Sequence, residues 1–148
     1  MIGQSLGAGA PDRAKRAGHE GVFQCGILAV AIAVLFFFAA APIFRSMSVD
    51  PLVRQVGAGP FRILALLQPC LALSIVYIGG LRGAGDTRFP MLITLAGAAL
   101  RVCVGYVGGF VLMGGLLGAW MGMFADMIWR AVAATIRFRR GNWIHSHI

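Results

Sequence analysis

Four long stretches of the chain carry almost no charge, and this pattern restricts the folds that the chain can adopt. Residues 21–44 and residues 63–81 contain no Asp, Glu, Lys or Arg. Residues 89–110 contain one charged residue, and residues 116–136 contain two. A helix of about 20 apolar residues crosses the hydrocarbon core of a bilayer. We therefore predict an all-α, polytopic membrane helix bundle with four transmembrane helices over these ranges, inside a membrane region that spans residues 21–148.

Prolines predict where these helices end or bend. Pro42 lies near the end of the first apolar run, and we expect the first helix to stop there. Pro51 and Pro60 are helix breakers, so the connection over residues 45–62 is expected to be irregular. Pro69 lies inside the second apolar run and predicts a kink near the middle of the membrane, because its ring removes one backbone hydrogen bond.

The charged segment 82–88 is the predicted loop between the second and third helices. Asp86 or Thr87 can cap the third helix, because short polar side chains accept hydrogen bonds from the first free backbone N–H groups. Pro90 suits the first turn of this helix, where no backbone N–H is needed.

The composition excludes several other classes of protein. Only 12% of the residues are charged, about half the share typical of a soluble domain. The net charge is +8, but the basic residues stand in small separate groups, so we predict no nucleic-acid binding. The three cysteines lie far apart and indicate neither a zinc site nor a disulfide framework.

No nucleophile with a base and no dinucleotide-binding loop is recognisable in the sequence, so we predict no enzymatic activity and no cofactor. His145 and His147, at the end of the chain, form at best a weak metal site, and we expect no bound metal. The partner that the sequence itself indicates is membrane lipid.

The basic residues are unequally divided between the two ends of the predicted helices. Residues 1–20, 82–88 and 137–148 fall on one side and hold eight of the 13 Lys and Arg, whereas residues 45–62 on the opposite side hold three. Cytoplasmic segments of membrane proteins carry the excess of Lys and Arg. We therefore predict a cytoplasmic connector over 1–20 and a cytoplasmic basic tail over 137–148.

Charged residues inside the third and fourth helices form a candidate polar cluster of Arg101, Asp126 and Arg130. With a rise of ~1.5 Å per residue, Arg101 and Asp126 lie at similar depths, about 16–18 Å from the cytoplasmic ends of their helices. Arg130 follows Asp126 by one turn. The cluster could form part of a substrate or proton pathway, or it could be a structural clamp between the two helices. The clamp is favoured, because two arginines keep the carboxylate ionised.

Small residues at four-residue spacing mark one side of the fourth helix, at Gly114, Gly118 and Gly122. Such spacing lets membrane helices approach closely. The pattern predicts tight packing inside the bundle. It also leaves open an alternative function, a membrane interaction module that transports nothing and assembles through this face.

Two loops carry patterns that point to a family. The first is GQ-x-x-GA, formed by Gly3, Gln4, Gly7 and Ala8. The second is RGAGDT-x-x-P, which includes Arg82, Gly83, Gly85, Asp86, Thr87 and Pro90. Together with the order of the helices and the Arg-Phe-Arg-Arg-Gly sequence at 137–141, these patterns make the chain resemble the C-terminal part of a multidrug and toxic compound extrusion (MATE) transporter. The resemblance covers essentially all of the chain.

The resemblance implies that the four helices are the last four of twelve and form part of the second six-helix lobe. It also implies export of organic cations or drugs in exchange for H⁺ or Na⁺, a location in the bacterial plasma (inner) membrane, and the missing N-terminal helices as partners. Some members of the family carry an ion-site acid on the helix that matches residues 63–81, and this chain has none there.

Met1 falls inside the first pattern, which suggests a truncated gene or an internally assigned start. We therefore expect the fragment to be inactive alone. A small exporter that works as an oligomer is a further alternative.

Overall fold

The computed structural model describes residues 1–112, 114–141 and 143, and the side chains of all of these except residues 54–56. The described residues form helices joined by short turns, without strands. The elements are α1 (Ile2–Gly7), α2 (Pro11–Met47), α3 (Pro51–Leu66), α4 (Gln68–Gly83), α5 (Arg88–Tyr106), the π-helical turn η1 (Val107–Val111) and α6 (Gly115–Arg140). The predicted all-α membrane helix bundle is therefore confirmed.

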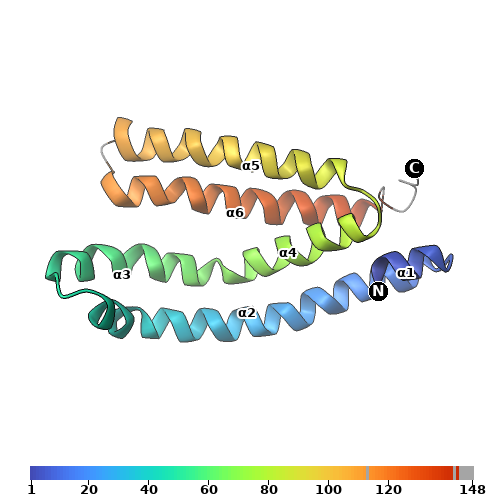
Figure 1. Ribbon diagram of the computed structural model, residues 1–148, viewed down its shortest axis with the longest axis horizontal. Helices are drawn as coiled ribbons and strands as arrows, with labels where there is room; N and C mark the ends of the chain where they lie inside the picture. The colour runs from blue at the N-terminus through green and yellow to red at the C-terminus, as the bar shows by residue number, and fades with distance from the viewer. Residues whose placement is uncertain (113, 142, 144–148) are drawn as a thin grey trace.

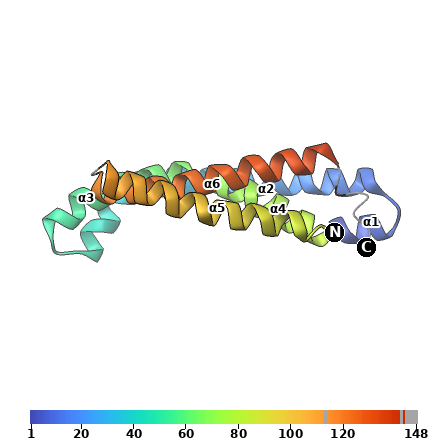
Figure 2. The ribbon, with the colours of Figure 1, turned by 90° about the horizontal axis from the view of Figure 1, so that it is seen from above.

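The long helices lie side by side in one layer, in the order α5, α6, the α3–α4 pair and α2 (Figure 1). The most extensive contact joins α5 to α6, and α4 packs against both α6 and α2. Seen from above, the layer is thin, and the start of α3 projects from it (Figure 2). The start of α2, the α4–α5 loop and the end of α6 all lie at one end of the layer (Figure 1).

Helix α2 is longer than the sequence predicts. It begins at Pro11 and reaches Met47, and its 37 residues are about 55 Å long. Pro42 lies inside it, so the prediction that the helix stops at this proline is wrong. A proline removes a single backbone hydrogen bond, and the residues that follow it still bond to their own turn, as at Ser48, whose backbone N–H donates to the Phe44 carbonyl.

The predicted irregular connection over 45–62 is also largely wrong, because α3 begins at Pro51. Asp50 caps this helix, and its Oδ1 accepts a hydrogen bond of 2.8 Å from the Leu52 backbone N–H. Pro51 therefore starts a helix, as prolines do in a first turn. Pro60 is accommodated inside α3.

The kink expected from Pro69 is confirmed. Helices α3 and α4 are separated at Leu67 and bend by 47° relative to one another. Pro69 lies in the first turn of α4, where its missing N–H leaves no bond unmade. The second predicted membrane helix is thus a bent pair with 16 residues on each side of the break.

Two of the described helical segments are long and apolar enough to cross a membrane, Pro11–Met47 and Arg88–Val111, and the bent α3–α4 pair is a third if it counts as one span. Helix α6 is not among them, although a fourth crossing was predicted over 116–136. Two charged residues and a glycine-rich start lower its mean hydropathy. Its place in the layer between α5 and α4 nevertheless makes it a fourth pass through the molecule (Figure 1).

Candidate functional site

Helices α5 and α6 touch through their backbones. A Cβ added at Gly118 would lie 2.7 Å from the backbone N of Gly109, and one added at Gly122 would lie 2.7 Å from the backbone N of Gly105. A Cβ on Gly114 would lie 2.7 Å from the carbonyl of Gly108. Any of these distances is too short for a real side chain, so the glycines permit the close approach.

The glycine face of α6 is therefore occupied inside the chain. Gly118 is buried against η1 and Gly122 against α5. This surface is not available for binding a second chain, and the geometry does not favour the alternative of a module that assembles through it.

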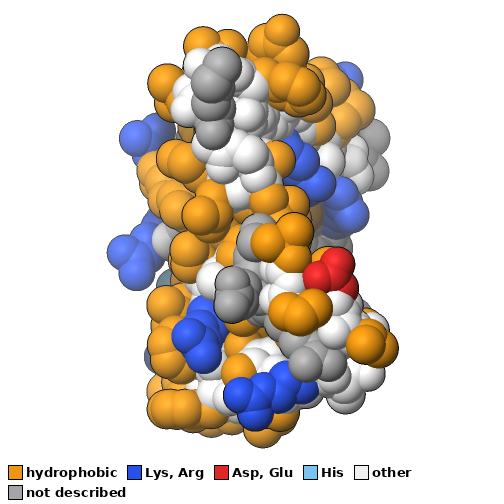
Figure 3. Space-filling model, turned by 90° about the vertical axis from the view of Figure 1, so that its left-hand side faces the viewer, with side chains coloured by type: hydrophobic (Ala, Val, Ile, Leu, Met, Phe, Trp, Pro, Cys, Tyr) orange, Lys and Arg blue, Asp and Glu red, His pale blue; other side chains and the backbone are white. Residues whose placement is uncertain are grey.

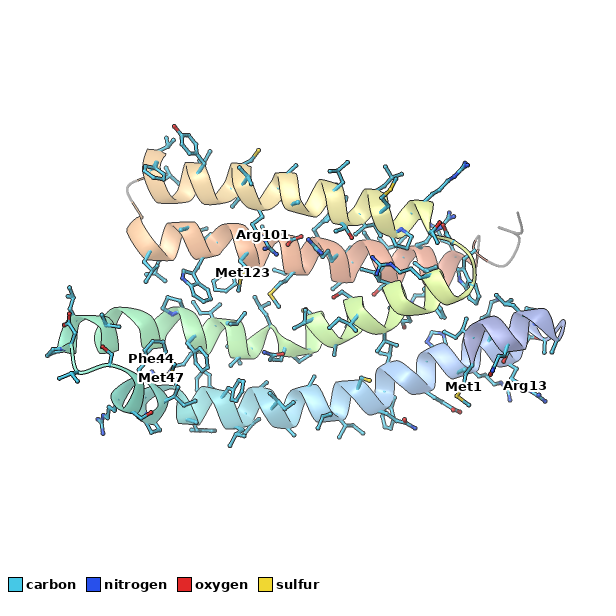
Figure 4. All side chains as sticks on the ribbon, in the orientation of Figure 1. Met1, Arg13, Phe44, Met47, Arg101 and Met123 are labelled. Carbon is cyan, nitrogen blue, oxygen red and sulfur yellow. The ribbon has the colours of Figure 1, made fainter. Side chains whose placement is uncertain are left out.

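A carboxylate lies at the centre of the α5–α6 contact. Asp126 is fully buried, Arg101 Nη2 donates to its Oδ2, and Arg130 Nε donates to its Oδ1 over 2.5 Å. Gly97 makes room for the group, because a Cβ there would overlap Asp126 Oδ1 and lie 3.1 Å from Arg130 Nε. Figure 4 shows Arg101 reaching from α5 toward α6. The three predicted cluster residues thus come together at one point.

The arrangement suits a clamp better than an ion-binding site. Both carboxylate oxygens of Asp126 accept from guanidinium groups, and these two adjacent positive charges repel a cation such as Na⁺. A second cross-link lies one turn away, where Trp129 Nε1 donates to the Ile93 carbonyl over 3.3 Å. Both contacts join the same two helices.

A second ion pair joins the α4–α5 loop to the end of α6. Asp86 is buried, and its Oδ2 accepts from Nη2 and Nε of Arg137 over 2.9 and 3.0 Å. Its Oδ1 accepts from the Phe89 backbone N–H over 3.4 Å at the start of α5. Asp86 and not Thr87 therefore provides the side-chain cap. The Arg137 guanidinium also lies over the Phe89 ring, 4.7 Å from its centroid.

An aromatic cluster lies at the same end of the layer. Phe138 of α6 stacks on Tyr77 of α4 and on Trp143, with ring centroids 4.6 and 4.8 Å apart. Trp143 Nε1 donates to the Phe138 carbonyl over 2.8 Å. His19 of α2 meets the Tyr77 hydroxyl at 3.4 Å. Three helices that are distant in sequence are joined here, and sequence reasoning missed both this cluster and the role of Arg137.

The two family patterns lie against each other at this end. A Cβ on Gly3 of α1 would overlap the backbone carbonyl of Gly83 at the end of α4, so only glycine fits. Gly85 adopts a φ of 90° in the loop, a conformation that favours glycine. Pro90 is fully buried at the start of α5. The Gln4 carbonyl accepts from the Ala8 backbone N–H over 3.0 Å to close α1.

Three pattern residues make no such contact. Gly7 has open space around it, and Arg82 and Thr87 are exposed. Of the predicted pattern residues, the structure therefore brings together those in the first turn of α1 and those around the end of α4.

The opposite end of the layer holds an apolar cavity of about 380 Å³ between α2, α3 and α6. All the residues described as lining it are apolar or glycine, among them Phe44, Phe61 and Trp120. Hydrophobic side chains dominate this end (Figure 3). Within the described part of the chain no group of three potential metal ligands occurs, and His145 and His147 lie outside it.

Comparisons of the chain with a family model and with known proteins agree on one family. The family model MatE matches residues 1–107. The chain is 31% identical over 144 residues to the probable multidrug resistance protein NorM of Thermotoga maritima, a match that covers 97% of this chain and 31% of that protein. It is 31% identical over 153 residues to the multidrug resistance protein PmpM of Pseudomonas aeruginosa, covering 99% of this chain and 32% of the relative.

A third relative is the multidrug resistance protein MdtK of Pectobacterium atrosepticum, 30% identical over 143 residues, with 93% of this chain and 31% of that protein covered. The chain thus spans about a third of the length of the curated relatives it matches. No solved structure matches it. Because the family model covers α1 to α5, including both loop patterns and Arg101, the chain belongs to the MatE family of integral membrane proteins.

Proposed function

We propose that the chain is part of a secondary active multidrug efflux transporter that exchanges organic cations or other drugs for H⁺ or Na⁺. The observation that carries this proposal is its similarity, over nearly its whole length, to relatives named as multidrug resistance proteins. Because the chain spans about a third of those relatives, the activity belongs to a larger set of helices. Further membrane helices of the same transporter are the proposed partners.

Within that transporter we assign the chain a supporting role in place of enzymatic or ion-binding chemistry. The Asp126 carboxylate is shared by two arginines, and residues 63–81 contain no acid. The carboxylate that binds the coupling ion would therefore be supplied by helices outside this chain. Helices α5 and α6, joined by the Asp126 clamp and by glycine packing, form a rigid pair against which other helices could move.

The orientation that we propose puts the basic end of the layer in the cytoplasm of a bacterial cell. The segments 1–20 and 82–88 and the end of α6 gather there (Figure 1), and Lys and Arg are enriched on the cytoplasmic side of bacterial plasma membranes. A C-terminal alkaline phosphatase or green fluorescent protein fusion distinguishes the two sides. Fluorescence without phosphatase activity is the expected result.

Transport is tested by joining the chain to the upstream helices of a relative. The upstream part of the Thermotoga maritima relative is fused to this chain at the GQ-x-x-GA pattern and expressed in bacteria that lack their own drug pumps. We expect the fusion to export ethidium, whereas the chain alone and a fusion that ends at Gly83, without α5 and α6, do not. A fusion that reaches the membrane intact but exports none of several organic cations would contradict the proposal, as would export by the chain alone.

A further inference from the structure

The charges at the α5–α6 contact do not balance. Two guanidinium groups, of Arg101 and Arg130, share the single carboxylate of Asp126, which leaves one positive charge in excess. A guanidinium stays protonated in proteins. Arg101 lies 13 residues after the start of α5, about 20 Å along the helix axis, and therefore deep inside a hydrocarbon core of about 30 Å. A charge at that depth needs a partner.

Arg101 is the arginine that still needs a partner. Its side chain is 51% exposed, against 26% for Arg130 and 0% for Asp126. One of its five N–H donors is directed at Asp126. The rest of the guanidinium is open on the surface of the layer. On α6, helical spacing puts Met123 on the same side as Arg130, and Figure 4 labels both Met123 and Arg101.

The surface around Arg101 is shaped for another helix. Helical spacing puts Thr94 and Ala98 on the same side of α5 as Arg101, and both have small side chains. Small residues allow close helix approach in a membrane. We call this surface, with Met123 of α6, the Arg101 face.

The other side of the layer is different. On α6, helical spacing puts Met121, Ile128 and Val132 opposite to Met123 and Arg130. These three side chains are 53%, 47% and 50% exposed and uncharged. That side suits contact with lipid chains, whereas the Arg101 face does not.

We propose that the Arg101 face binds a further membrane helix that presents a carboxylate to Arg101. Anionic lipid headgroups do not reach this depth. A second copy of the chain lacks a suitable acid, because Asp126 is buried and paired and the other four acids lie outside the apolar stretches of the sequence, at Asp12, Glu20, Asp50 and Asp86. The curated relatives are about three times as long as this chain, so their remaining sequence can supply such a helix. The proposal concerns assembly and does not require that the protein transport drugs.

The test uses a defined probe. The full chain, with its three native cysteines replaced by Ala and Met123→Cys introduced, is reconstituted in neutral phosphatidylcholine vesicles with a poly-leucine transmembrane peptide. The peptide carries one central Glu and a neighbouring Cys, and a second peptide carries Gln in place of Glu. We expect about five-fold more disulfide cross-linking with the Glu peptide, because a polar contact between membrane helices contributes of the order of 1 kcal/mol.

Matched variants locate the effect. Arg101→Lys should keep the preference for the Glu peptide, Arg101→Gln should abolish it, and Arg62→Gln, at an exposed arginine near the other end of the layer, should leave it unchanged. A cysteine at Ile128 on the opposite side should show no preference. Helix content by circular dichroism confirms that each variant is folded.

Several results would overturn the proposal. These are equal cross-linking of the Glu and Gln peptides, a preference that survives Arg101→Gln in a folded variant, stronger capture at Ile128→Cys, and cross-linking of Met123→Cys between two copies of the chain in preference to the peptide. If Arg101→Gln does not fold, the comparison of the two peptides on the chain with Arg101 intact still decides the question. Drug export is not measured, so failure here is distinct from failure of the proposed transport.

Discussion

Replacing Asp126 by Asn tests whether the buried carboxylate is a clamp. Asn has the same shape, but it is neutral, and its amide N–H₂ would face a guanidinium, donor against donor. Two contacts would be lost or weakened, those from Arg101 and Arg130. Polar contacts in membranes contribute about 0.6 to 1.7 kcal/mol each, because the unfolded chain also finds partners. We therefore expect Asp126→Asn to lower the free energy of unfolding by about 1–3 kcal/mol, which is less than the ~3–5 kcal/mol typical of broken buried pairs in soluble proteins.

The measurement is reversible unfolding of the chain in mixed micelles by increasing sodium dodecyl sulfate, followed by far-ultraviolet circular dichroism. Asp50→Asn is the matched control. Asp50 is an exposed N-cap of α3, and Asn caps helices as well as Asp does, so its effect should stay below about 0.5 kcal/mol. If Asp126→Asn were as mild as this control, and a complete transporter with the same change folded normally but lost ion coupling, the clamp interpretation would be wrong and the pathway interpretation correct.

Substitutions at Gly122, Asp86 and Phe138 probe other contacts of the bundle, each measured by the same unfolding experiment. Gly122→Ala should cost about 1–3 kcal/mol, because its Cβ would overlap the backbone of α5, whereas Gly109→Ala, with its nearest atom at 3.5 Å, should be much milder. Asp86→Asn should cost about 1–3 kcal/mol through its buried pair with Arg137, and the loss should vanish in an Arg137→Gln background. Phe138→Ala should cost about 3–5 kcal/mol and change the tryptophan emission, since the ring stacks on its neighbours. Equal losses at Gly122 and Gly109 would contradict the packing argument.

The membrane architecture could be predicted because its physical cause is local. Uncharged runs of about 20 residues require a helix in lipid whatever their neighbours are. The bend next to Pro69 follows from a local rule, because a proline starts a helix more readily than it continues one. Similar depths for Arg101 and Asp126 follow from a constant rise per residue, and the two side chains are bonded in the structure.

The errors in the predicted helices come from reading three of the prolines as helix ends or breakers. Pro42 and Pro60 lie inside helices, and Pro51 begins one. A proline in an interior position costs one hydrogen bond, and the apolar surface that the helix buries against its neighbours can outweigh that loss. Which prolines are tolerated depends on the contact between α2 and α3, which no local pattern specifies.

The candidate site could be predicted only in part for a related reason. Asp86 and Arg137 are 51 residues apart, and the contact of Tyr77 with His19 spans 58 residues. Such pairs depend on which helix ends meet after the layer has formed. Their only sequence signals are the acid in the α4–α5 loop and the basic residues at the end of α6. Neither signal identifies the residue that it contacts.

The thinness of the layer explains why this chain needs surroundings beyond itself. A compact protein of 15.7 kDa exposes about 7,300 Å², whereas this chain exposes 9313 Å². The difference of about 2,000 Å² is comparable to a large protein–protein interface. In the most apolar windows of the two spanning segments only 17% of the residues are buried. Lipid can cover the apolar part of this area without cost, but it cannot cover Arg101. The uncompensated charge therefore separates the surface that faces lipid from the surface that requires more protein.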